Sequence, residues 1–172
     1  MAKKKLHPIA RLAKAAVESF VSEGKLVRPE DLTPEMAERA GVFVSIKKHG
    51  ELRGCIGTFA PTKKNVAEEI IHNAINSATG DPRFEPVHPS ELPDLDYSVD
   101  VLTSPEPVSS KDELDPRKYG VIVEHGFRKG LLLPDLKGVD TVDRQIAICR
   151  MKAGIAEDEP VKLYRFQVRR YR

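Results

Sequence analysis

The residue types best suited to chemistry lie in the segment Leu52-Arg-Gly-Cys-Ile-Gly-Thr58. Side chains of a strand alternate between its two faces, so we expect Arg53, Cys55 and Gly57 to share one face. A guanidinium close to a thiol favours the thiolate and lowers the thiol pKa. The pattern therefore predicts Cys55 as a candidate nucleophile or ligand, with Arg53 as the cation that activates it.

The glycines of this segment support the same interpretation. Glycine contributes no side chain to the packing of a strand, so Gly54 and Gly57 indicate close approach by a ligand or another backbone, or a bulge. We expect Gly54, Gly57 and Thr58 to belong to a substrate-binding site around Cys55. The alternative is that Cys55 is a buried packing residue, because free cysteine behaves as a small hydrophobic side chain.

A second polar cluster follows the helix that we predict over residues 62–79. The sequence Asp81-Pro82-Arg83-Phe84 places an acid, a base and an aromatic ring in one turn. Arginine binds carboxylate and phosphate groups through two parallel hydrogen bonds, so Asp81 and Arg83 are candidates for orienting a substrate. The alternative is a structural turn in which Asp81 pairs with Arg83 and Phe84 packs into the core.

The composition restricts the class of protein. The 172 residues include 28 Lys or Arg against 26 Asp or Glu, a net charge of +2, and 40% of them are hydrophobic. This balance is typical of a globular chain and gives no general reason to expect nucleic acid or membrane as a partner. Two cysteines far apart predict neither a zinc site nor a disulfide framework. No apolar run is long enough to span a membrane, so we expect a soluble cytoplasmic protein.

Metal, cofactor and nucleic-acid signatures are weak in this sequence. The five histidines show no HExxH, HxH or Cys-His spacing, so no metal site is predicted, and no nucleotide-binding or cofactor motif is present. The C-terminal segment is basic. It either contacts RNA phosphates or forms the solvated side of an edge strand, and the modest net charge of the chain favours the edge strand. Its cations are Lys162, Arg165, Arg169, Arg170 and Arg172.

Hydrophobic periodicity predicts the elements that position these residues. Apolar residues recur every three or four positions in three helices, over residues 8–22, 62–79 and about 140–154, with Thr62 and either Asp140 or Thr141 as N-caps. Cys149 lies on the apolar face of the third helix and is predicted to pack in the core. Alternating residues predict hairpins over 41–59 and 119–133 and strands over 95–101 and 161–171, whereas the proline-containing residues 103–118 indicate a loop.

The two halves of the chain are similar to each other. Gly41-Val-Phe-Val44 and Gly120-Val-Ile-Val123 are each followed by His-Gly, by a basic residue and glycine, then by a helix and a strand. We infer an internal duplication of two hairpin–helix–strand units, residues 41–102 and 119–171, within a single domain over 1–172. The predicted fold is α+β, with each helix laid over a mainly antiparallel sheet and a groove between the halves as the natural ligand site. This alignment places Leu131 at the position of Cys55.

These motifs resemble a known family. The segment Leu52–Thr58, preceded by Gly41-Val-Phe-Val44, is similar to the hallmark of the AMMECR domain family, which is named for a human chromosomal deletion region. Three later motifs match in the same order, and the resemblance spans about Ile9 to Tyr171. Asp135 departs from the pattern, because many members carry glutamine there. The later motifs are Asp81-Pro-Arg-Phe84, Gly130-Leu-Leu-Leu-Pro134 and Lys152-Ala-Gly154.

The resemblance implies a compact fold with a main body, a smaller lobe and a cleft between them. It also implies an intracellular protein with no established activity, substrate or cofactor, which in many prokaryotes accompanies a Memo-type protein and a radical SAM protein. Arg53, Gly54, Cys55 and Gly57 are then the expected centre of the site. We therefore expect a catalytic component that acts on a small-molecule or macromolecular substrate, and the alternatives are a non-catalytic protein-binding adaptor or an RNA-binding protein.

Overall fold

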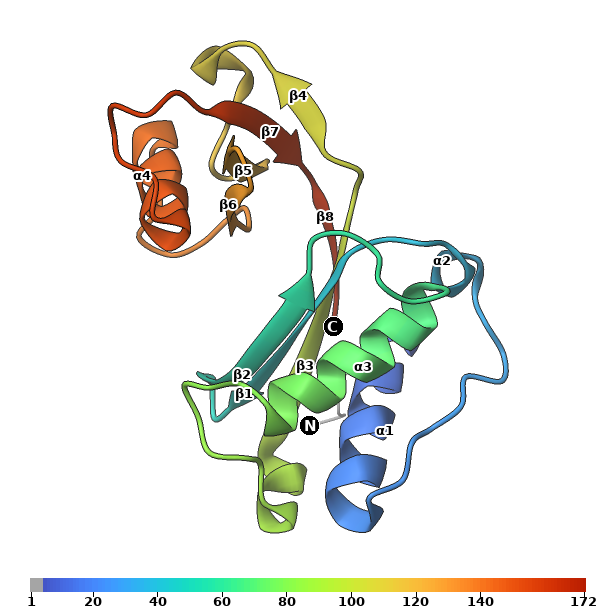
Figure 1. The fold of residues 1–172 in the computed structure, drawn as a ribbon. Coiled ribbons are helices and arrows are strands. Elements are labelled where there is room, and N and C mark those ends of the chain that lie inside the picture. The colour runs from blue at the N-terminus through green and yellow to red at the C-terminus, as the bar shows by residue number, and fades with distance from the viewer. Residues whose placement is uncertain (1–4) are drawn as a thin grey trace. The chain divides into compact units, whose positions relative to one another are not determined.

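The computed structural model describes residues 5–172, which fold as two compact units (Figure 1). Unit 1 comprises the chain up to Val101 together with Arg169–Arg172, and unit 2 comprises Leu102–Val168. Each unit has its own four-stranded sheet and its own apolar core. The predicted α+β class is therefore confirmed. Within the described residues, no helix combines the length and the apolar character needed to cross a membrane.

Unit 1 packs its helices on one face of a sheet with the strand order β2-β1-β3-β8. The core contains Val42, Val44 and Ile46 of one strand and the apolar residues of two helices, which Figure 1 shows on the same side of the sheet. The elements are α1 (Pro8–Glu23), α2 (Pro34–Ala37), β1 (Val42–Lys48), β2 (Glu51–Thr58), α3 (Val66–Thr79), the 3₁₀ helix η1 (Pro89–Asp94), β3 (Leu95–Leu102) and β8 (Val168–Tyr171).

The helices of unit 1 begin and end at residues with identifiable caps. α1 ends where Gly24 adopts a left-handed conformation with φ of 66°, which glycine tolerates without steric cost. α3 begins after Asn65, whose side chain accepts a hydrogen bond from the Glu68 N–H at 2.9 Å. The prediction that Thr62 caps this helix is therefore wrong, since the intervening residues form a loop.

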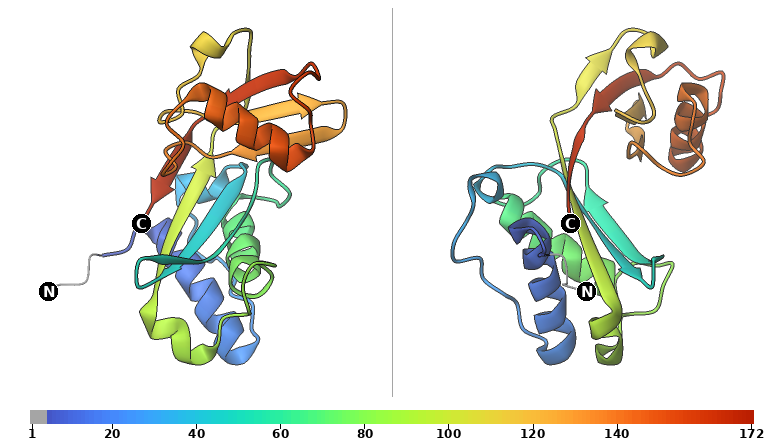
Figure 2. Two further views of the ribbon diagram at one scale, coloured as in Figure 1. Left: turned by 90° about the vertical axis from the view of Figure 1, so that its left-hand side faces the viewer. Right: turned by 180° about the vertical axis from the view of Figure 1, so that it is seen from behind.

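Unit 2 lays one helix over a sheet with the strand order β4-β7-β5-β6, as the views in Figure 2 show. Thr141 is the N-cap of this helix. Cys149 lies on the apolar face of the helix and is fully buried, as predicted. The elements are β4 (Glu106–Val108), the 3₁₀ helix η2 (Lys111–Glu113), β5 (Gly120–His125), β6 (Arg128–Leu132), α4 (Val142–Ala153) and β7 (Lys162–Phe166).

Two predictions about unit 2 need correction. Residues 103–118 are not all loop, because they include β4, which pairs with β7, and η2. Residues 161–171 are not one strand, because the pattern breaks at Gln167 and the two pieces join different sheets, β7 in unit 2 and β8 in unit 1. A period of two residues continues through such a break, so the sequence pattern did not reveal it.

The hairpins of the two units contact their helices in the same way. A Cβ at Gly54 of β2 would overlap the carbonyl oxygen of Ser77 in α3, and a Cβ at Gly130 of β6 would overlap the carbonyl oxygen of Cys149 in α4. Each glycine therefore permits a strand backbone to approach a helix backbone. In both sheets the hairpin strands and the following strand also have the same order, β2-β1-β3 and β6-β5-β7. The internal duplication behind this similarity stays a prediction.

Replacing either glycine is expected to destabilise the protein. The variants Gly54→Ala and Gly130→Ala each force a methyl group against a helix carbonyl, so the free energy of unfolding should fall by about 2 kcal/mol or more. Urea denaturation followed by circular dichroism measures the change. Lys47→Ala, at an exposed position of β1, is the control and should change stability by less than about 0.5 kcal/mol. Unchanged midpoints for both glycine variants would contradict the close-approach explanation.

Candidate functional site

The strand that carries Cys55 lies at the edge of the unit 1 sheet and contains an irregularity. Ile46 pairs with Gly54 and Lys47 pairs with Leu52, so Arg53 is an extra residue in β2. Such a bulge interrupts the alternation of side chains between the two faces. The prediction that Arg53 shares a face with Cys55 is therefore wrong.

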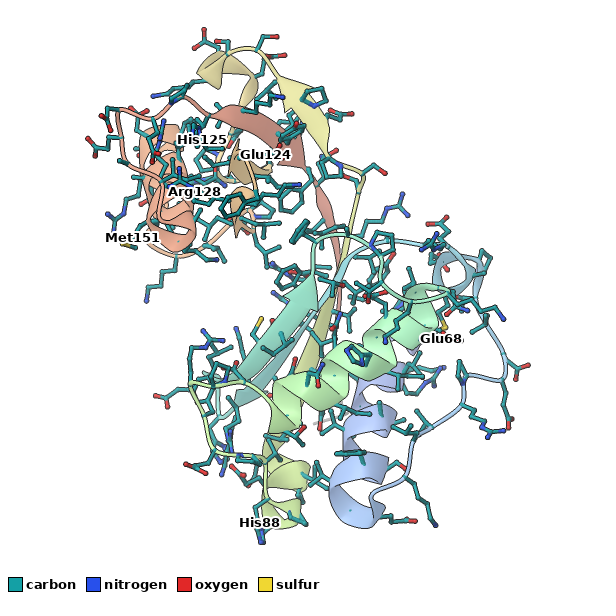
Figure 3. The ribbon with its side chains drawn as sticks, viewed as in Figure 1. Glu68, His88, Glu124, His125, Arg128 and Met151 are labelled. Carbon is teal, nitrogen blue, oxygen red and sulfur yellow. The ribbon has the colours of Figure 1, made fainter. Side chains whose placement is uncertain are left out.

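The Arg53 side chain serves instead to hold the β1–β2 hairpin against η1. Its Nε and Nη2 donate to the two carboxylate oxygens of Glu91 at 3.0 and 3.1 Å, and its Nη1 donates to the carbonyl of Glu85 at 2.9 Å. Lys48 and the backbone N–H of His88, the residue before η1 (Figure 3), donate to the same carboxylate. The Arg53 guanidinium lowers the pKa of Glu91 to about 2.

The face of the sheet that points away from α3 carries Cys55 and its neighbours. Alternation from the buried positions of β1 places Phe43 and Ser45 on this face, and their partners in β2 are Gly57 and Cys55. Ser98, the partner of Ser45 in β3, completes a row of small polar side chains with Ser45 and Cys55. We call the set Phe43, Ser45, Cys55, Gly57, Ser98 and Asp100 the Cys55 face.

Contacts within unit 1 account for the glycines and for Thr58. Gly54 makes room for the backbone of Ser77, and the Phe43 ring occupies the space that a Cβ of Gly57 would need. The Thr58 hydroxyl donates to the buried Glu69 at 2.7 Å, on the side of β2 that contacts α3. Their assignment as substrate-binding positions stays a prediction, and intramolecular packing explains them without a ligand.

Asp81 and Arg83 form the expected pair and bind the backbone of Cys55. The Asp81 carboxylate, 2% exposed, accepts from Arg83 Nε at 3.1 Å and Nη2 at 2.8 Å and from the Cys55 N–H at 3.0 Å. Arg83 Nη2 also donates to the Cys55 carbonyl at 3.3 Å. The pair thus satisfies both outward-pointing backbone groups of an edge strand at this residue. Arg83 holds the pKa of Asp81 far below its usual value.

The Cys55 thiol is half-buried and protonated at neutral pH. Burial raises its pKa, and this effect outweighs the hydrogen bond with the Ser45 hydroxyl, 3.3 Å from the sulfur, and the charge of Arg83, both of which lower the pKa. The expectation that Arg53 activates the thiol is therefore wrong, because the nearby cation is Arg83, and its effect on the thiol pKa is smaller than that of burial. The nearby Asp100 carboxylate, which forms a two-hydrogen-bond pair with Arg170, raises the pKa further.

The sequence analysis missed the buried polar residues of α3 that contact the hairpin. Glu69, Asn73 and Ser77 are each 2% exposed or less, and Asp81 continues the same spacing of four residues beyond the helix. Asn73 donates to the Val42 carbonyl at 2.9 Å. The Ser77 hydroxyl accepts from the Ile56 N–H at 2.9 Å. A polar residue at every fourth position between apolar ones was the available signal, because it marks one helix face.

Glu69 is the most extensively bonded member of this series. Its carboxylate accepts four hydrogen bonds, from the hydroxyls of Thr58 and Thr62 and from the backbone N–H groups of Thr62 and Lys63. These bonds keep the pKa of Glu69 below its usual value despite burial. Among residues 5–172, no group of three or more His, Cys, Asp or Glu side chains is placed to hold a metal ion.

Comparison with known proteins establishes the family. The AMMECR1 family model matches residues 10–171, and a Thermotoga maritima protein is 54% identical over 96% of this chain and 98% of its own length. A Clostridium acetobutylicum protein is 47% identical over 99% of this chain, which spans 37% of that longer protein. The crystal structure of an uncharacterized Pyrococcus horikoshii protein superposes with a TM-score of 0.87 at 35% identity, covering 94% of this chain and 88% of that one. The chain therefore belongs to the AMMECR1 family.

The ion pairs of Glu91 predict a loss of stability in acid. The folded-state pKa, about 2, lies below the ordinary value of 4.5, so the stabilisation is complete above about pH 4.5 and disappears as the pH falls towards 2. Glu91→Gln should lower the free energy of unfolding by about 2 kcal/mol at pH 7, and its difference from the unsubstituted protein should shrink between pH 4.5 and 2. Urea titrations at several pH values measure both quantities. Glu51→Gln, at an exposed position, is the control, and a difference that does not depend on pH would contradict the assignment.

Proposed function

We propose that the chain is a component of a catalytic system and that its substrate lies against the Cys55 face. The observation that carries the proposal is the arrangement of Asp81, Arg83 and Cys55. A nearly inaccessible carboxylate holds a guanidinium that is 56% exposed beside a half-buried thiol. Buried charges that orient an exposed cation next to a potential nucleophile are typical of functional sites.

In this proposal the thiol has two states. The protonated form donates or accepts a hydrogen bond with the Ser45 hydroxyl, and loss of the proton gives a thiolate close to the charge of Arg83. The thiolate is the form that acts as a nucleophile in covalent catalysis or as a ligand. Arg53, which the sequence suggested as part of the site, acts only as a positioning residue for the hairpin through Glu91.

A non-catalytic adaptor is the second candidate function. The observation in its favour is that the polar groups around Cys55 already bond to one another, while burial raises the thiol pKa. The partners suggested by the family resemblance are Memo-type and radical SAM proteins. RNA binding has less support, because two cations of the basic C-terminal segment are paired, Arg165 with Glu106 and Arg170 with Asp100.

The reactivity of Cys55 tests the catalytic proposal. We expect iodoacetamide to modify Cys55 in the folded protein with a pH profile displaced above that of an ordinary thiol, because burial raises the pKa. Ser45→Ala removes a hydrogen bond that lowers this pKa, so alkylation at a fixed neutral pH should slow severalfold. Mass spectrometry of the peptide that contains Cys55 gives the rate separately from the buried Cys149. Ser98→Ala, on the same face, is the matched control.

One outcome would end the proposal of a reactive thiol. A Cys55 that stays unmodified until denaturant is added cannot meet a substrate in the folded protein. The catalytic proposal would then fail.

Association measurements separate the adaptor from the catalytic component. An adaptor should bind purified Memo-type or radical SAM proteins equally well with Cys55 or with Cys55→Ala, and it should show no turnover of its own. Pull-down with tagged partners measures the binding. Absence of association, together with turnover by the isolated chain, would contradict the adaptor function.

A further inference from the structure

The hydrogen-bond donors of Arg83 are unequally used. Nε and Nη2 donate side by side to Asp81, and Nη2 also donates to the Cys55 carbonyl. Within residues 5–172, Nη1 has no hydrogen-bond partner, although a guanidinium carries two protons on that nitrogen. The side chain is 56% exposed, so Nη1 is the donor that a ligand can reach.

We propose that Arg83 binds a carboxylate group of the substrate end-on through Nη1, beside the Cys55 thiol. The inference rests on the proposed function and specifies the class of substrate for the same site. It differs from the expectation that Arg83 orients a substrate through two parallel hydrogen bonds, because Asp81 already occupies the Nε–Nη2 edge of the guanidinium. The substrate carboxylate is therefore held by one nitrogen of the guanidinium and needs a further donor.

Ser45 and Cys55 supply the further donor. The hydroxyl and the protonated thiol carry one hydrogen each, and the single hydrogen bond between them uses one of the two. The other hydrogen is available to a ligand oxygen on the Cys55 face. A carboxylate between Arg83 Nη1 and this pair would accept one charge-assisted and one neutral hydrogen bond.

The charges around the site favour a singly charged group over a dianion. Two carboxylates lie near the sulfur, those of Asp81 and Asp100, and each is balanced by its own arginine. A phosphate dianion would bring a second negative charge towards both carboxylates, and each of the two arginines already balances one of them. A carboxylate with a single charge meets less repulsion and still gains the contact with Nη1.

The guanidinium is held in place before any ligand binds. Asp81 holds it through two hydrogen bonds, and the Phe84 ring lies 5.4 Å from its central carbon. A side chain that is held in place before binding loses little conformational entropy when the ligand arrives. The buried Asp81 is therefore a positioning residue for Arg83.

Two alkylating reagents of nearly equal size test the proposal. Iodoacetate carries a carboxylate and iodoacetamide carries a neutral amide, and in both reactions the thiolate sulfur displaces iodide from a methylene carbon while the thiol proton passes to solvent. If Arg83 binds the carboxylate, iodoacetate should modify Cys55 faster relative to iodoacetamide than it modifies the denatured chain, by about tenfold. The readout is this ratio of rates, measured on the peptide that contains Cys55.

Variants assign the preference to Arg83. Arg83→Gln should return the ratio to that of the denatured chain, whereas Arg11→Gln, which removes an exposed cation of α1 on the other side of the sheet, should leave it unchanged. If Arg83→Gln does not fold, competition in the unsubstituted protein replaces it. Acetate should then slow modification by iodoacetate, and acetamide at the same concentration should not.

The outcomes distinguish this inference from the proposed function. If iodoacetamide modifies Cys55 but the ratio equals that of the denatured chain, carboxylate recognition is overturned and the proposed function stands. The same conclusion follows if Arg11→Gln abolishes the preference as completely as Arg83→Gln does. If neither reagent modifies Cys55 in the folded protein, both proposals fail together.

Discussion

The contact on which the arrangement of unit 1 depends is the close approach of α3 to the edge strand β2. It is possible only because residue 54 has no side chain, since a Cβ there would overlap the carbonyl oxygen of Ser77. Three residues later the helix has ended at Gly80, and the next residue, Asp81, meets the backbone N–H of Cys55. The position of the Asp81–Arg83 pair therefore follows from the packing of glycine against a helix. A helix one side-chain layer further from the strand, a few ångströms away, would place the Asp81 carboxylate beyond hydrogen-bond distance of Cys55.

Close approach at this interface requires that its polar groups be satisfied, and the residues of α3 achieve this. Asn73 and Ser77 bond to backbone groups of β1 and β2, and Glu69 bonds to the loop that follows β2. Burying an unpaired carboxylate or amide would cost several kcal/mol, so Glu69, Asn73 and Ser77 are stable inside the protein only when their hydrogen bonds are all formed. One consequence is a rigid β2, because its backbone is held from the helix side by Ser77 and from the edge by Asp81. A thiol on such a strand keeps a fixed position, and its partial burial explains the raised pKa.

Local sequence patterns predicted most elements of the fold, and long-range contacts decided the details that they missed. Both hairpins, the three helices and the strand after α3 follow from periodicities of two and 3.6 residues. The position of Arg53 does not, because the glycines of this segment indicated a bulge only as one of several explanations and did not show which residue is the extra one. The prediction identified Cys55, Asp81 and Arg83 as a possible site, and the structure brings these three together. It assigned the neighbouring cation incorrectly, because the arginine nearest in sequence to Cys55 bonds to η1.

Comparison with unit 2 shows which features of the Cys55 site serve the packing of a helix on a hairpin and which do not. The hairpin of unit 2 contacts its helix through Gly130 and the Cys149 carbonyl. Gln145 donates to the carbonyl of Tyr119, the residue before β5, much as Asn73 donates to the carbonyl of Val42 in β1. At the position of Cys55 stands Leu131, whose carbonyl accepts from Lys152 as the Cys55 carbonyl accepts from Arg83. Close helix–strand packing and a basic cap on the edge strand therefore occur without any thiol, and they need no function beyond stability. What unit 1 adds is the sulfur and a buried carboxylate that orients the capping cation. Helix–strand packing, which both units share, does not explain the sulfur or the buried carboxylate. The functional proposals therefore concern Cys55, Asp81 and Arg83 and not the neighbouring glycines.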